Sequence, residues 1–460
     1  MSQHPHLERH LGLRSATSLV IGSIIGTGIF LKTAAMTQAV HSPLMVLLVW
    51  CFAGALSCTG ALVYAELGAR YPKAGGEFIF LREGYNSFIA FCYGWMRFWI
   101  GSPASIAAYG VGCASFAGGI YPNLSANEKI MMAQGLILGF TLLNCMTVVV
   151  GGWVQDVLTA LKILLVVGLG LSLVVYAPEG WSLASLGITA DAGMTGEGGD
   201  SVGLTMSGLG AAMLAALWAF DGWNNMPMAA GEIRNPQRNI PLALILGTLA
   251  CLLLYVGINF AYFVALPVSE IVTSNSSSFR DALPVAAKAA KNILGDSAAT
   301  WIGFAFIISA LGAMNGSILT GARVPYAMAR DGLFFRVLAN VGKRSHVPVV
   351  AVVVQGLWAS VLAGSGSFDQ LTNYVVFSSW IFYALCAWSL FRLRKKDESG
   401  EMTFRCPWYP WTPSVFVVLA LLLLAQTIAD DPVATMHGVG IIAAGIPLFF
   451  WMKRGHHHAK

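Results

Sequence analysis

The first stretch with the potential for chemistry is the glycine-rich segment from Gly22 to Phe30, which reads GSIIGTGIF. It lies in the middle of a long apolar segment, and each interior glycine costs a helix about 1 kcal/mol relative to alanine. The pattern therefore predicts a helix that is interrupted inside a membrane. Where a helix is interrupted, its unpaired N–H and C=O groups can bind a small charged molecule.

A second interruption is predicted around Asp221, where residues 217–225 read LWAFDGWNN and Pro227 follows. Glycine and proline both disfavour a continuous helix. The Asp221 carboxylate has two compatible roles. It can cap the helix that resumes after the break, or it can line a binding cavity, as ionisable groups inside membranes often do.

Lys162 is the third candidate, about two turns into another apolar segment. An ionisable residue at this depth is expected to face the protein interior. The alternative is a lysine whose ammonium reaches the headgroups along its flexible stem. Arg97 is interpreted as structural, and Glu66 and Glu232 as groups that hydrogen-bond at helix ends near an interface.

Composition places these residues in a membrane protein. Of 460 residues, 56% are hydrophobic and only 11% are charged, whereas a soluble domain has about 25% charged residues. No cleavable signal peptide is expected, because the apolar run after residue 12 is too long. About twelve spans of roughly 20 residues are predicted, at 13–39, 43–69, 85–117, 130–150, 154–177, 203–231, 241–267, 298–329, 347–364, 368–391, 411–429 and 433–452.

The distribution of positive charge predicts the orientation. Most Lys and Arg residues fall on the side that holds both termini, so both termini are expected in the cytoplasm. The membrane is expected to be the inner (plasma) membrane of the cell. The opposite side has few cations, and its loop at 178–201 has none. A second external segment, 268–299, is expected either to lie over an outer vestibule or to be a plain connector.

The spans that begin at residues 13 and 203 are both interrupted near the middle, and five spans separate their starts. Interrupted segments at corresponding positions of two halves are typical of transporters built from inverted repeats. A half-helix that begins in the membrane attracts a carboxylate, and one that ends there attracts an ammonium. Two adjacent breaks therefore predict a receptor for a zwitterion such as an amino acid.

At this point the sequence resembles a known group. The segment 22–30 resembles the first-helix motif of the amino acid–polyamine–organocation superfamily. Further stretches narrow the resemblance to the L-type amino acid transporter family, the light chains of heteromeric transporters and their bacterial relatives. These stretches are VQDVLTALK at 154–162, WAFDGWNN at 218–225, GEIRNPQRNIP at 231–241, LGAMNGS at 311–317, Arg323, and ARDG at 329–332.

The resemblance implies an all-α integral membrane protein with a LeuT-type five-plus-five inverted repeat. Its parts would be a cytoplasmic tail (1–12), a first repeat (13–177), a second repeat (203–391), two further helices (411–452) and a second cytoplasmic tail (453–460). It implies sodium-independent transport of amino acids by exchange and alternating access. No cofactor is implied, and no metal role is assigned to the histidines at 456–458.

Site residues carry over from the family by position. In the first break, the Ile24 carbonyl would bind the substrate ammonium, and Gly26, Thr27 and Gly28 would bind the carboxylate. In the second break, the carbonyls of Trp218 and Asp221 would complete the ammonium site. Trp218 would also gate the substrate, Phe220 would contribute to the pocket, and Asn224 would stabilise the break.

Lys162 matches a lysine that the family places where sodium-coupled relatives bind a cation. Its ammonium would tie the fifth span to the first break near Gly22 and Ile25, and to the eighth span near Ser309. A fixed ammonium of this kind accounts for sodium independence. In a rival reading, Lys162 or Asp221 carries a coupled proton.

The sequence departs from the animal light chains in one respect. Those chains carry a cysteine between spans three and four that forms a disulfide with a heavy chain, and residues 118–128 here have none. A stand-alone carrier is therefore expected. Asp221 leaves two substrate classes open. Neutral amino acids are the class we favour. The other class is cationic amino acids, whose side chain would pair with the Asp221 carboxylate.

Functions of other classes find less support. The sequence has no HExxH, G-x-S-x-G or P-loop motif and no paired carboxylates at catalytic spacing, so an enzyme is not expected. Nucleic acid binding is not expected either, because the positive charge is explained by membrane orientation. A channel or a non-transporting amino acid sensor remains a remote alternative.

Overall fold

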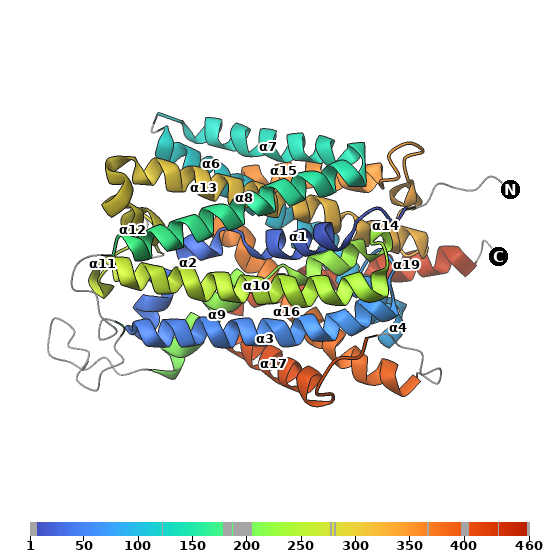
Figure 1. Ribbon diagram of the computed structural model, residues 1–460. Coiled ribbons are helices and arrows are strands. Elements are labelled where there is room, and N and C mark those ends of the chain that lie inside the picture. Colours follow the sequence, from blue (N-terminus) through green and yellow to red (C-terminus); the bar gives the residue numbers. More distant parts are fainter. Residues whose placement is uncertain are drawn as a thin grey trace.

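The fold is a bundle of roughly aligned helices (Figure 1). The computed structural model describes residues 7–121, 123–177, 186, 205–276, 278–279, 282–365, 368–396, 404–430 and 432–457. The acidic external loop predicted at 178–201 lies outside these residues, apart from residue 186. Within the described part no strand forms, and one isolated bridge joins Leu11 to Ile233.

The helices follow the predicted spans closely. Their bounds are α1 Leu13–Ile24, α2 Gly28–Val40, α3 Pro43–Arg70, α4 Glu77–Gly84, α5 Ser87–Met96, η1 Arg97–Gly101, α6 Ser102–Ile120, α7 Ala126–Met146, α8 Val148–Val175, α9 Met206–Phe220, η3 Trp223–Glu232, α10 Pro236–Ala265, α11 Val268–Val272, α12 Val285–Leu294, η4 Gly295–Ser297, α13 Ala298–Gly321, α14 Arg323–Arg330, η5 Arg336–Ala339, α15 Val349–Ser365, α16 Phe368–Lys396, α17 Trp411–Asp430, α18 Pro432–Ala444 and α19 Ile446–His457.

Local sequence explains where several helices begin. The Ser42 hydroxyl accepts a hydrogen bond from the Met45 N–H at the start of α3, and Pro43 occupies the first helical position. Ser125 and Glu128 form a reciprocal capping box at the start of α7. Such caps satisfy N–H groups that a helix terminus leaves unpaired, and each lies in a polar break between apolar runs.

The membrane character of the fold is clear, whereas the number of spans stays a prediction. Among the described residues, seven helical stretches are long and apolar enough to cross a membrane, and the bent pair α1–α2 makes an eighth. Three of the four other predicted spans fall short for identifiable reasons. The third contains the π-helical turn η1, the sixth is divided into α9 and η3, and α15 has only 17 residues.

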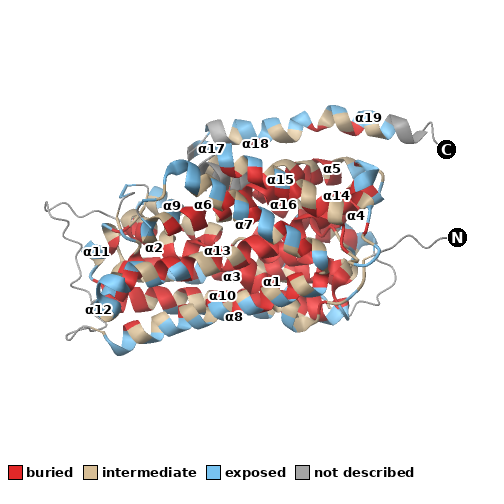
Figure 2. Cartoon of the chain, turned by 90° about the horizontal axis from the view of Figure 1, so that it is seen from above, coloured by how far each residue is buried: buried red, intermediate tan, exposed pale blue. Residues whose placement is uncertain are grey.

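The buried residues lie in the middle of the bundle, around the two broken segments (Figure 2). α1 packs against α8, α10, α13 and η3, and α2 packs against α9. α19 runs along the outside, where Phe450 and Trp451 are exposed. α1 begins and α19 ends at the same end of the molecule, opposite α11 and α12, as an even number of spans would require (Figure 1).

Candidate functional site

The first break separates α1 from α2 at residues 25–27, and the two helices are inclined by 40°. Thr27 takes the N-cap position of α2, but its side chain makes no capping hydrogen bond. Its hydroxyl is buried and has no hydrogen-bond partner in the structure. The first N–H groups of α2 have no partner within their helix, so this terminus offers donors to an anion.

The carbonyl groups of the first break are bonded to side chains of the surrounding helices. The Lys162 ammonium, which is 1% exposed, donates to the Gly22 oxygen at 2.6 Å and to the Ile25 oxygen at 2.7 Å. The Ser309 hydroxyl of α13 lies 3.1 Å from the Ile25 oxygen and 2.9 Å from the Gly26 oxygen. Lys162 therefore faces the protein interior and does not extend to the headgroups.

The Ile24 carbonyl also has partners. The Tyr255 hydroxyl of α10 lies 2.9 Å from the Ile24 oxygen and 2.9 Å from the Ala219 oxygen, so it bridges the two broken segments. The Gly26 N–H donates to the same Ile24 oxygen at 2.8 Å. Since a carbonyl oxygen has two lone pairs, a substrate ammonium would have to displace Tyr255 to bind Ile24 as the resemblance implies.

The second break lies between α9 and η3. Asp221 has extended backbone dihedrals, and Gly222 adopts a φ of 123°, which L side chains rarely tolerate. The segment resumes as a 3₁₀-helix with Pro227 inside it, and no side chain caps its start. The Asp221 carboxylate accepts a hydrogen bond from the Tyr383 hydroxyl at 2.8 Å, and its capping role stays a prediction.

The two breaks meet through glycine. A Cβ atom on Gly222 would lie 2.7 Å from the Ser23 carbonyl oxygen and 3.1 Å from the Ile24 nitrogen. A Cβ atom on Gly28 would lie 2.7 Å from the Ala219 Cβ. The two distances of 2.7 Å are shorter than packed atoms allow, so glycine at positions 222 and 28 permits this approach of the two segments.

A small cavity of about 40 Å³ lies between the breaks. Among the predicted site residues, its lining includes those of the first break and two from the second: Ile24, Gly26, Thr27, Gly28, Trp218 and Asp221. Ser105, Ala108 and Tyr109 of α6 complete the wall together with Ala219. The cavity therefore has the N-terminus of α2 and the C-terminus of α9 on its surface.

Two predicted substrate contacts do not reach this cavity. Phe220 is fully buried, with its ring 5.8 Å from Trp50 and 4.9 Å from Tyr255, so it packs behind the break. Asn224 is buried in η3, past the turn at Gly222.

The interpretation of Glu66 and Glu232 as helix-end groups needs correction. Both side chains are fully buried, and each is paired with an arginine. The Arg323 guanidinium donates to both Glu232 oxygens at 2.8 and 2.9 Å, and Arg394 Nε donates to Glu66 at 2.9 Å. A buried carboxylate needs such a partner because burial without one is costly. Arg97, interpreted as structural, is buried and donates to the Asn225 side chain.

The end of the bundle that holds these ion pairs is closed by backbone hydrogen bonds as well. The Leu11 N–H donates to the Glu232 carbonyl at 2.9 Å, and the Arg234 N–H donates to the Leu11 carbonyl at 2.8 Å. The Gly75 N–H donates to Met228 in η3 at 2.8 Å. The N-terminal residues and the turn before α4 are thus tied to the segment that follows the second break.

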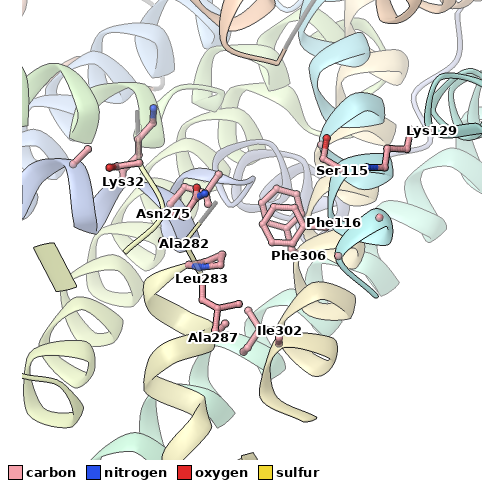
Figure 3. Close-up of a pocket in the computed structure, with 18 residues that line it drawn as sticks. Lys32, Ser115, Phe116, Lys129, Asn275, Ala282, Leu283, Ala287, Ile302 and Phe306 are labelled. Carbon is pink, nitrogen blue, oxygen red and sulfur yellow. The ribbon is translucent and has the colours of Figure 1, made fainter. Parts of the chain in front are cut away.

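At the opposite end the molecule is open. A cavity of about 720 Å³ lies among α2, α6, α12 and α13 (Figure 3). The external segment 268–299 lies at this cavity, because its residues Asn275, Leu283 and Ala287 line it. Of the two expectations for this segment, a cover over an outer vestibule fits better than a plain connector. One end of the protein is therefore closed while the other admits solvent.

Comparison with known proteins agrees with this geometry. The sequence pattern of the amino acid permease family matches residues 11–450, and the chain belongs to this family. It is 30% identical to the serine/threonine exchanger SteT of Bacillus subtilis (strain 168) over 452 residues, which cover 97% of this chain and 98% of that protein.

Two human proteins extend the comparison. The b(0,+)-type amino acid transporter 1 of Homo sapiens is 29% identical over 459 residues, 98% of this chain and 89% of that protein. The human cystine/glutamate transporter is 29% identical over 463 residues, 97% of this chain and 87% of that protein. The resemblance to the L-type transporters is thereby confirmed, and the protein is a multi-pass membrane protein of an amino acid transporter family.

Sequence reasoning missed the tyrosines of the site, Tyr109, Tyr255 and Tyr383. A tyrosine within an apolar run has no diagnostic spacing, and its ring alone suits a buried helix face. One signal was available, because a buried phenol hydroxyl usually finds a hydrogen-bond partner. The unpaired carbonyls of a broken helix are the natural partners.

Proposed function

We propose that the protein is a sodium-independent exchanger of neutral L-amino acids that works by alternating access. The observation that carries this proposal is the cavity between the breaks, where one helix begins and another ends. Such termini complement the carboxylate and the ammonium of an amino acid. The name of the serine/threonine exchanger among the relatives supports both exchange and neutral substrates.

The proposed binding mode follows from which backbone groups are already bonded. The substrate carboxylate binds the N–H groups at Thr27 and Gly28 and the unpartnered Thr27 hydroxyl. The ammonium binds the carboxylate of Asp221, which lines the cavity, and the adjacent carbonyl end of α9. Trp218, at the cavity wall, is the proposed gate above the substrate.

Sodium independence is proposed to rest on Lys162. Its ammonium binds two carbonyl oxygens at the first break, as a coordinated cation would, while Ser309 bonds the same Ile25 oxygen. A covalently fixed charge needs no ion from solution. It also gains hydrogen bonds that compensate for burial.

Alternating access requires the closed end to open. We propose that it faces the cytoplasm, because both termini and most Lys and Arg residues lie there. Opening would break the Leu11 hydrogen bonds and separate elements now joined by Arg323 and Glu232. The carrier is proposed to act without a disulfide-linked heavy chain, as residues 118–128 contain no cysteine.

The proposal is tested by counterflow in proteoliposomes. Vesicles loaded with an unlabelled amino acid should accumulate the radiolabelled one, saturably and equally well when choline replaces sodium. A panel of competing amino acids would then identify the substrates. Failure to observe counterflow with any of the twenty amino acids would contradict transport and favour a sensor, provided that ligand binding is measurable.

A proton-coupled symporter is the second candidate. The observation that favours it is the presence of two titratable groups at the breaks, Lys162, which is buried, and Asp221, which is half-buried and lines the cavity. Net uptake driven by a pH gradient into vesicles without internal substrate would support this candidate over exchange.

A further inference from the structure

A buried arginine belongs to the chain segment that forms one wall of the cavity between the breaks. Arg97 is the first residue of η1, the π-helical turn before α6, and is 5% exposed. Gly101 connects it to the cavity: a Cβ atom on Gly101 would lie 2.8 Å from the Arg97 Cδ, and the Ser105 hydroxyl donates to the Gly101 carbonyl at 2.8 Å. Because Ser105 lines the cavity, the arginine lies about two helical turns from the cavity wall along this segment.

The guanidinium of Arg97 reaches the second break. It donates to the Asn225 side chain of η3, while its Nε has no hydrogen-bond partner among the described residues. It also interacts electrostatically with the carboxylates of Glu77 and Asp221. Tyr109, in the cavity wall, interacts in the same way with both Arg97 and Asp221. The charge of the arginine is therefore felt at the cavity.

Glu77 supplies a second carboxylate to this region. It is fully buried at the first residue of α4, where a helix terminus favours negative charge. Its oxygens accept hydrogen bonds from the Tyr64 hydroxyl at 2.8 Å and from the Tyr93 hydroxyl. Burial raises the pKa of the Glu77 carboxyl, whereas the charge of Arg97 and the two phenols act in the opposite direction. These three neighbours therefore favour the ionised form.

Four ionisable side chains near the breaks balance in charge, and we call them the charge group. The ammonium of Lys162 and the guanidinium of Arg97 are positive, and the carboxylates of Glu77 and Asp221 are negative. A buried charge without a partner is costly. An amino acid with no net charge preserves the balance, whereas a cationic one brings an additional positive charge that the charge group does not compensate.

We propose that Arg97 determines the charge selectivity of the site, because its guanidinium offsets one of the two carboxylates and thereby disfavours cationic amino acids. The inference rests on the proposed function and deepens it by naming the residue that selects neutral substrates. With the backbone groups of the substrate held by the two breaks, its side chain faces the α6 wall, where Ser105 and Tyr109 lie. A cationic side chain there meets the positive potential of Arg97.

The experiment measures how two competitors displace a radiolabelled neutral amino acid, chosen from the counterflow panel, from the purified full chain. The competitors are homoserine and α,γ-diaminobutyrate, which have equal numbers of heavy atoms and differ in side-chain charge at neutral pH. In the wild type, α,γ-diaminobutyrate should bind at least about tenfold more weakly than homoserine, because like charges repel at a desolvated site. In Arg97→Gln the two affinities should become similar, mainly because α,γ-diaminobutyrate binds more tightly. Arg97→Lys should keep the wild-type ratio, since it keeps the charge.

Further variants separate charge from structural damage. Glu77→Gln removes a negative charge and should weaken both competitors. The double variant, Arg97→Gln with Glu77→Gln, removes one charge of each sign and should recover the wild-type ratio, whereas two independent structural defects would add. Tyr93→Phe is the matched control, because it removes a hydrogen bond of Glu77 without changing any charge. It should leave the ratio unchanged.

Three results would overturn the inference. Equal affinity of the two competitors for the wild type would show that the site does not disfavour a cation, and this measurement needs no variant. An unchanged ratio in Arg97→Gln, or an equal change in Arg97→Lys, would reduce Arg97 to a structural partner of Asn225. A double variant that keeps the ratio of Arg97→Gln would exclude charge balance as the cause. Absence of displacement by any amino acid in the wild type would instead be a failure of the proposed function.

Discussion

The two helix breaks are built differently although both face one cavity. In the first break, Lys162, Ser309 and Tyr255 bond the carbonyls of Gly22, Ile24, Ile25 and Gly26. In the second break, Tyr255 bonds the Ala219 carbonyl and Tyr383 bonds the Asp221 carboxylate. The Trp218 carbonyl accepts from the Asp221 N–H at 3.1 Å. The first break is bonded by side chains of three surrounding helices, whereas the second has a carboxylate, Asp221, as its distinguishing acceptor.

This difference is consistent with two separate roles for the breaks, one in binding the carboxylate of the substrate and one in binding its ammonium. We propose that the first break, where α2 begins, binds the substrate carboxylate, and that the second break, where the Asp221 carboxylate lies, binds the ammonium. The predictions below test this division, beginning with the change of largest expected effect.

Lys162→Ala should abolish exchange. The change leaves the Gly22 and Ile25 carbonyls without their cation, and each unsatisfied buried polar group costs about 1–3 kcal/mol. Counterflow in proteoliposomes measures the loss. Leu161→Ala is the control, because that neighbouring side chain is 39% exposed on the outside of the bundle. Unchanged kinetics in Lys162→Ala would show that the first break does not depend on this tether.

Gly28→Ala should weaken both folding and binding, whereas Gly26→Ala should affect binding alone. A Cβ on Gly28 would meet the Ala219 Cβ at 2.7 Å, and overpacking of this kind costs about 1–3 kcal/mol. A Cβ on Gly26 would meet Tyr109 at 3.4 Å, an ordinary contact. Melting temperature in detergent and substrate affinity should separate the two variants. Equal melting temperatures with equal affinities would contradict the distinction.

Tyr255→Phe should lower substrate affinity about fivefold to tenfold, because the carbonyls of Ile24 and Ala219 lose a shared donor at a cost of about 1 kcal/mol or more. Equilibrium binding of a radiolabelled amino acid measures the change. A rise in affinity would instead mean that a carbonyl released by Tyr255, at Ile24 or at Ala219, binds the ammonium better without this hydroxyl.

Asp221→Asn should have the smallest effect on neutral substrates, a few-fold rise in KM, because one charged acceptor becomes neutral. Lysine or arginine should lose more as competitors if their side chains contact the carboxylate. Tyr383→Phe is the matched variant, since it removes the hydrogen bond to Asp221 and keeps the charge. An identical loss for neutral and cationic competitors would argue against a side-chain contact.

The sequence was informative about the breaks and less so about their surroundings. Gly26, Gly28 and the Asp221–Gly222 pair marked both interruptions because glycine and proline have strong local effects. The burial of Glu66 and Glu232 was not foreseen, since Arg394 and Arg323, which donate to them, lie far away in the chain, although Arg70 is only four residues from Glu66. The tyrosines around the cavity were missed for the same reason: contacts between distant helices leave no local spacing.

The contact of Gly222 with Ser23 and Ile24 has a consequence for how this family can diversify. At Gly222 the two breaks approach each other through backbone atoms, and no side chain of Gly222 takes part. Mutations on the α6 wall of the cavity, at Ser105, Ala108 or Tyr109, are therefore expected to alter selectivity, while the contacts proposed for the amino acid backbone stay unchanged. Mutation of Gly222 has the opposite character, because it should impair every substrate alike.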